Sequence, residues 1–119
     1  MTSEAGGSGL WRRRLDPLPA VVLEDGLTVH VAAGPFARLR GLAGLEDLPG
    51  DHGLLLPRTR SVHTFGMRFP VDVVFLDRCG WPIGVRRTVG PRRIVFCRTA
   101  AAVIEMRAGD ADRHFVVVE

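Results

Sequence analysis

Asp72 is the residue whose setting most needs a chemical explanation. It stands inside the apolar run Val71-Asp72-Val73-Val74-Phe75-Leu76. A buried carboxylate without a partner is costly, so we expect it to bind Arg40, Arg68 or backbone N–H groups. We favour a structural role at the start of a strand. The alternative is a ligand-binding carboxylate or a general base.

Ser61, His63 and Asp72 together supply the residue types of a nucleophile, a base and an orienting acid. On a strand, Ser61 and His63 would share one face with their Cβ atoms about 7 Å apart, too far for a direct hydrogen bond. No glycine-flanked nucleophile turn is present either. We therefore predict that His63 is a hydrogen-bonded strand residue. A hydrolase-like enzyme that uses His63 and Asp72 is kept as an alternative, and it requires the two side chains to converge.

The leading functional hypothesis is a non-catalytic binding or accessory module for a small ligand or a protein partner. No recognisable catalytic set is present, and several polar residues surround the Asp72 motif. We expect the ligand in a cleft that is lined by Arg40, His63, Thr64, Met67, Arg68 and Asp72.

Neither a metal nor a cofactor is predicted. The four histidines, at positions 30, 52, 63 and 114, show no metal-ligand spacing, and no Cys-x-x-Cys motif occurs. The Gly41–Gly44 segment lacks the lysine and the length of a phosphate-binding loop.

All 16 basic residues are arginine, and they are distributed unevenly. Lysine, asparagine and tyrosine are absent, which indicates a G+C-rich genome rather than an acidic partner. Residues 51–98 nevertheless carry nine arginines against three acids. A weaker alternative function is therefore nucleic-acid binding through an arginine-rich hairpin around Gly90-Pro91. A solvated sheet face explains the same residues more simply. The basic residues of this hairpin are Arg86, Arg87, Arg92, Arg93 and Arg98.

Length and composition predict one folded domain. The chain has 119 residues and is 46% hydrophobic, enough for one core and too little for two. We expect a flexible tail at residues 1–9 and a single β-rich domain at residues 10–119. No apolar run resembles a signal peptide or a membrane span, so we expect a cytoplasmic protein with free thiols at Cys79 and Cys97.

Short apolar segments between glycine and proline turns predict the elements that position these residues. A helix is expected at residues 35–40, because Pro35 suits a first helical position and Gly41 a helix end. Residues 11–14 read as an arm or an edge strand, and residues 102–107 as a strand or a helical turn. The fold class is therefore mainly β, a sandwich or barrel with one short helix. Strands are expected at residues 20–33 (a hairpin), 53–56, 61–65, 71–76, 81–88, 93–97 and 115–119.

The order of these landmarks resembles the family called domain of unknown function 192. The resemblance rests on Arg40-Gly41-Leu42, Gly53-Leu54-Leu55, the stretch from Pro70 to Asp77, and Ile104-Glu105-Met106 followed by Ala108-Gly109. The resemblance implies a compact β-rich fold, but it does not indicate an activity, because the family is uncharacterised. The chain departs from the family pattern in three places. The segment from His63 to Arg68 resembles a variant branch of the family, and Leu45 stands where many members have a second arginine. Many members have a glycine-aspartate turn before a last strand, whereas this chain passes directly from Asp110 to Phe115.

Overall fold

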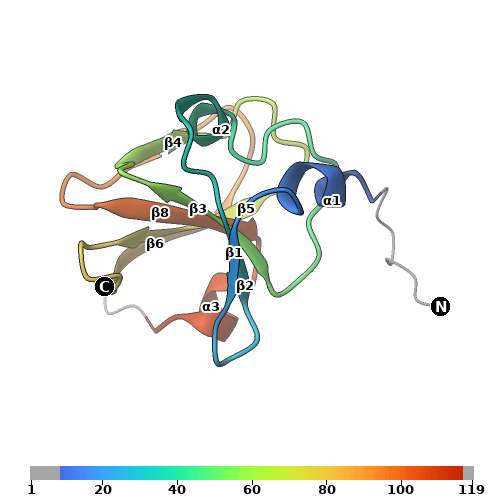
Figure 1. Ribbon diagram of the computed structural model, residues 1–119. Coiled ribbons are helices and arrows are strands. Elements are labelled where there is room, and N and C mark those ends of the chain that lie inside the picture. The colour runs from blue at the N-terminus through green and yellow to red at the C-terminus, as the bar shows by residue number, and fades with distance from the viewer. Residues whose placement is uncertain (1–8, 117–119) are drawn as a thin grey trace.

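Eight strands and three short helices make up residues 9–116, the part of the chain that the computed structural model describes (Figure 1). The prediction of a mainly β fold is confirmed, although there are three helices rather than one, and the described strands do not close into a barrel. In chain order the elements are α1 (Leu10–Leu15), β1 (Ala20–Val22), β2 (Thr28–Val31), α2 (Pro35–Arg40), β3 (His52–Pro57), β4 (Ser61–His63), β5 (Val71–Leu76), β6 (Pro82–Val89), β7 (Ile94–Phe96), β8 (Ala102–Arg107) and α3 (Ala111–His114).

Six strands form one mixed sheet in the order β1-β2-β3-β8-β5-β6. Among the described strands, only β2 and β3 run parallel, and the helix α2 lies in the connection between them. The strands β4 and β7 pair with each other in a separate small sheet. The sequence predicted an arginine-rich hairpin around Gly90-Pro91, but β6 pairs with β5 while β7 pairs with β4. That hairpin is therefore not formed.

The large sheet is covered on both faces, as the burial of all six residues of β5 requires. Val71, Val73 and Phe75 point into the larger core, which also contains Trp11 of α1 and Val62 of β4. The alternate residues Val74 and Leu76 point to the opposite face, into a smaller core that contains Ala111 of α3. Figure 1 shows the same arrangement, with α1 and α2 on one side of the sheet and α3 on the other.

The segment predicted as an arm or an edge strand is the helix α1. Trp11 and Leu15 lie one helical turn apart and are both buried, so this short helix is stabilised by packing rather than by its intrinsic propensity. The helix α2 has the predicted bounds, with Pro35 in its first turn and Gly41 at its end.

The C-terminal region differs from the prediction of a strand over residues 115–119. The helix α3 stands between Asp110 and Phe115, and neither Phe115 nor Val116 belongs to a strand, while residues 117–119 lie outside the described part. Residues 102–107 are a strand. Both cysteines are free thiols. No helix within residues 9–116 is long and apolar enough to cross a membrane.

Candidate functional site

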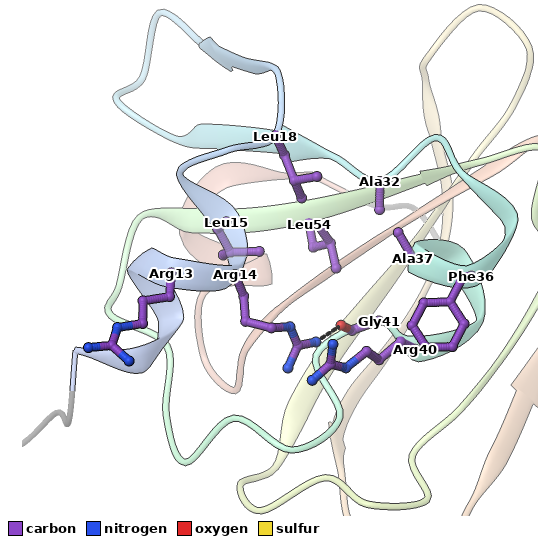
Figure 2. Close-up of a pocket in the computed structure, with 10 residues that line it drawn as sticks. All are labelled: Arg13, Arg14, Leu15, Leu18, Ala32, Phe36, Ala37, Arg40, Gly41 and Leu54. Carbon is purple, nitrogen blue, oxygen red and sulfur yellow. Dashed lines mark hydrogen bonds between the residues drawn. The ribbon is translucent and has the colours of Figure 1, made fainter.

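A pocket of about 270 Å³ lies where α1, α2 and the strands β2 and β3 meet (Figure 2). Its floor is apolar, because α1 and the following loop contribute leucines, β3 contributes Leu54, and Ala32 directly follows β2. Arg14 and Arg40 stand at one side, and Figure 2 shows their guanidinium groups next to each other, whereas Arg13 points away from them. The apolar lining residues are Leu15, Leu18, Ala32, Phe36, Ala37 and Leu54.

The guanidinium of Arg14 is fixed by the backbone that follows α2. Its Nη1 donates to the carbonyl of Ala43 at 2.8 Å, and its Nη2 donates to the carbonyl of Gly41 at 2.6 Å. Burial, and then the positive charge of nearby Arg40, lower the pKa of Arg14. No carboxylate within residues 9–116 forms an ion pair with Arg14 or Arg40. The pocket therefore holds two neighbouring positive charges beside an apolar floor.

Gly41 separates this pocket from the buried carboxyl group of Glu105. Glu105 is only 1% exposed, and its Oε1 accepts a hydrogen bond of 3.2 Å from the Leu42 amide. Burial raises the pKa of this carboxyl to about 7, since that one hydrogen bond compensates only part of the lost hydration. A Cβ atom at position 41 would lie 2.6 Å from Oε1, and the φ of 54° is also one that favours glycine.

A second, smaller cavity of about 50 Å³ is lined by Arg40, His63 and Glu105, among other residues. His63 cannot act freely as a base there. Its Nε2 lies 3.1 Å from the Leu39 carbonyl and must donate to it, while its Nδ1 accepts from the Phe65 amide at 3.2 Å. The His63 ring connects the end of α2 to β4.

Asp72 binds backbone amides rather than an arginine. Its Oδ1 accepts from Thr88 at 2.8 Å, and its Oδ2 accepts from Gly109 at 2.9 Å and from Ala111 at 3.1 Å. The Thr88 amide belongs to an irregularity in the pairing of β5 with β6, where Thr88 itself has a φ of 52°. Asp72 points to the face covered by α3, opposite the face on which His63 and β4 pack, so these two side chains do not converge.

The remaining residues of the predicted cleft have separate environments. The Thr64 hydroxyl donates to the Gly90 carbonyl at 2.7 Å and accepts from the Arg93 amide at 2.8 Å. Met67 is 6% exposed and belongs to the larger core. Arg68 forms an exposed ion pair with Glu46 at 3.2 Å. Of the six predicted residues, only Arg40 lines the larger pocket, and only Arg40 and His63 line the smaller cavity.

The five arginines of the nucleic-acid alternative are divided between the two sheets. Arg86 and Arg87 lie on β6, and Arg87 pairs with Asp112 of α3 at 3.0 Å. Arg92 and Arg93 precede β7, and Arg98 follows it. They therefore do not flank one hairpin.

Sequence reasoning did not find the pairing of Arg14 with Arg40 or the burial of Glu105. Glu105 follows Ala102-Val103-Ile104, so the signal that singled out Asp72, an acid inside an apolar run, is present there as well. No comparable signal marks Arg14, because α1 and the loop after α2 approach each other only in the folded chain.

A further cluster that the sequence does not signal is formed by Asp51, Asp110 and His114, whose ligand atoms lie within 4.8 Å of one another. These groups already bind each other and their neighbours: His114 contacts Asp25 at 2.9 Å and Asp51 at 2.8 Å, and Arg113 lies 3.5 Å from Asp51. Burial alone would lower the pKa of His114, but the hydrogen bonds to the two aspartates outweigh it and raise this pKa. The cluster holds α3 against the β1–β2 turn.

Comparisons with known proteins agree with this fold. A structure from Sinorhizobium meliloti 1021, described as a "putative transcription regulator", has a TM-score of 0.66 and 28% sequence identity over 79% of this chain and 81% of that chain. A protein of unknown function from Novosphingobium aromaticivorans DSM 12444 has a TM-score of 0.65 over 79% of this chain and 74% of that chain. At 17% identity its similarity concerns the fold alone.

No curated protein matches the chain in sequence. The model of the family described as DUF192, an uncharacterized ACR, matches residues 20–119, which include all eight strands, Arg40 and Glu105. The chain belongs to the domain of unknown function 192 family.

Proposed function

We propose that the chain is a non-catalytic binding protein for a small organic anion, a carboxylate that carries an apolar tail, which it takes up in the pocket between α1, α2 and β3. The observation that carries this proposal is the juxtaposition of Arg14 and Arg40 without a carboxylate partner in the described part of the chain. Like charges repel each other, and the repulsion is stronger where water is partly excluded. A bound anion would remove this repulsion.

The geometry of Arg14 supports a pre-formed site. Two of its nitrogens are held by the carbonyls of Gly41 and Ala43, so its side chain is already ordered before a ligand arrives. Arg40 is exposed, and its guanidinium donates no hydrogen bond to another residue within the described part of the chain, so it remains able to bind an anion. A planar guanidinium matches the two oxygens of a carboxylate, which gives the pairing its direction.

The apolar floor supports a ligand with a hydrocarbon portion. Leu18 and Ala37 are partly exposed and Phe36 at the rim is 73% exposed, so an apolar tail could cover surface that now contacts water. Leu15 and Leu54, each 1% exposed, lie beneath this surface. A volume of about 270 Å³ suits a small molecule. A purely inorganic anion would leave this floor unused.

The hydrolase-like alternative receives no support from the geometry. It requires His63 and Asp72 to converge, whereas His63 binds Leu39 and Phe65 and Asp72 binds three amides on the opposite face of the sheet.

Isothermal calorimetry with hexanoate tests the proposal. We expect saturable binding to the unaltered chain and an affinity at least tenfold lower for Arg40→Gln, because a hydrogen bond to a charged group contributes roughly 1.5–3 kcal/mol. Arg86→Gln is the matched control, since Arg86 is an exposed arginine that does not line the pocket. Equal affinity in Arg40→Gln and in the unaltered chain would contradict the proposal.

A further inference from the structure

A further concave region, separate from the two cavities described above, is lined by four arginines. It has a volume of about 530 Å³, and its lining consists of Arg58, Arg60, Arg78, Arg98, Thr99, Ala100 and Ala101. None of these residues lines the pocket between α1 and α2. All four arginines are exposed, whereas Ala100 at the base is buried.

Three separate turns bring these arginines together. Arg58 and Arg60 lie between β3 and β4, Arg78 lies in the turn between β5 and β6, and Arg98 follows β7. Backbone hydrogen bonds join the turns: the Thr59 amide donates to Ala101, and the Cys97 amide donates to Arg60 at 2.9 Å. The Ala101 amide in turn donates to Leu76, at the end of β5, at 2.8 Å. The arrangement is therefore part of the folded framework.

The four positive charges are not neutralised by the described residues. No ion pair joins Arg58, Arg60, Arg78 or Arg98 to a carboxylate within residues 9–116. The neighbouring acid, Asp77, uses its Oδ1 to accept from the Cys79 and Trp81 amides, both at 2.9 Å, and so closes its own turn. Within residues 9–116, the only side-chain hydrogen bond from these arginines is a long one, 3.5 Å, from Arg58 to the Ala33 carbonyl.

We propose that this four-arginine groove, Arg58, Arg60, Arg78 and Arg98, binds a polyanion with two or more closely spaced phosphate groups. Four guanidinium groups carry more positive charge than a single carboxylate can neutralise, whereas a chain of phosphates offers several oxygens and several negative charges. The Thr99 hydroxyl adds a neutral donor at the same place. The groove lacks the leucine floor of the first pocket, so its ligand needs no hydrocarbon tail.

Calorimetry with inorganic tripolyphosphate tests this site. We expect about tenfold weaker binding in Arg98→Gln and in Arg78→Gln, and a change of less than twofold in Arg86→Gln. The control removes the same charge from an exposed position on β6 that does not line the groove. An equal loss of affinity in all three variants would show that tripolyphosphate binding depends only on the net charge of the protein, which would overturn the proposal. Absence of tripolyphosphate binding by the unaltered chain would also overturn it.

Two further measurements identify the source of the phosphates and separate this site from the first. If tripolyphosphate displaces a labelled ten-nucleotide thymidine strand and the strand binds more tightly, the phosphates of a nucleic-acid backbone are the ligand. If the strand does not bind, the ligand is a free polyphosphate or a nucleotide. Hexanoate should bind Arg98→Gln as it binds the unaltered chain, so failure at either site leaves the other testable.

Discussion

At the scale of single residues, Asp72 explains how an irregular part of the sheet is held in place. Its two oxygens accept from amides on the β6 irregularity, on the turn after β8 and at the start of α3. Each of these donors would otherwise need another acceptor near the smaller core. One carboxylate thereby connects three segments of the chain.

Replacing Asp72 with alanine should lower the free energy of unfolding by about 4 kcal/mol. Three amides would lose their acceptor, and an unsatisfied buried donor costs roughly 1–3 kcal/mol. Urea denaturation measures the change. Asp112→Ala is the control, because its exposed ion pair with Arg87 contributes at most about 1 kcal/mol. A loss below 1 kcal/mol in Asp72→Ala would argue against a structural role.

Glu105 predicts a pH dependence of stability. Its pKa is raised to about 7 in the folded chain, above the ordinary value near 4.5. Between these pH values the folded chain holds a proton that the unfolded chain has released, so stability falls as the pH rises from 4.5 to 7 and is then constant. This pKa shift corresponds to a decrease in the free energy of unfolding on the order of 3 kcal/mol between pH 4.5 and pH 7.

Glu105→Gln should remove this loss. The amide oxygen can still accept from Leu42, and the glutamine side chain is neutral at every pH, so it has no proton to lose as the pH rises. The measurement is the urea denaturation midpoint of the variant and of the unaltered chain between pH 4.5 and pH 8. Both proteins keep the same histidines, so the difference between the two curves gives the contribution of position 105. Parallel curves for the variant and the unaltered chain would contradict it.

At the scale of elements, α1 is held by a histidine pair as well as by its leucines. The ring of Trp11 lies 4.7 Å from that of His52, and His52 Nδ1 lies 3.1 Å from His30 Nε2. Burial lowers the pKa of both histidines, and the charge of His30 further lowers that of His52. Asp16 acts in the opposite direction on both rings, and Asp51 on His52. The pair therefore favours the neutral state.

Acidification should loosen α1. A histidine whose folded pKa is lowered contributes stability that is present above its ordinary pKa near 6.5 and is lost as the pH falls. In a Trp81→Phe background, we expect the Trp11 emission to shift to longer wavelength between pH 6.5 and pH 5. Trp11 in His52→Leu should keep its emission over that range, and the same red shift in both proteins would show that another group is responsible.

The predictability of these elements depends on how local their determinants are. The helix α2 follows from Pro35 and Gly41, and β5 from six consecutive residues, so both were predictable from the sequence. The helix α1 was not, since its six residues contain three arginines and only tertiary packing of Trp11 and Leu15 selects the helix. The same applies to the site: the contact of Arg14 with Gly41 joins residues 27 positions apart, which a local pattern does not encode.

At the scale of the whole molecule, the two sides of the sheet have different roles. The side with α3 is held by Asp72 and by the aspartate–histidine cluster at α3. The side with α1 and α2 holds the pocket with Arg14 and Arg40, and behind it the buried Glu105. Loss of α1 would remove Arg14 and part of the apolar floor, so anion binding should depend on the integrity of this helix.

The most direct test of the central claim, that this pocket binds an amphipathic carboxylate, is a calorimetric series of acetate, butyrate and hexanoate. Each methylene buried against the exposed apolar lining of the pocket contributes about 0.8 kcal/mol, or roughly a fourfold gain in affinity. We predict that affinity rises along the series until the pocket is filled, and that Arg40→Gln weakens every member. Equal affinity for the three carboxylates, or no effect of Arg40→Gln, would contradict the account.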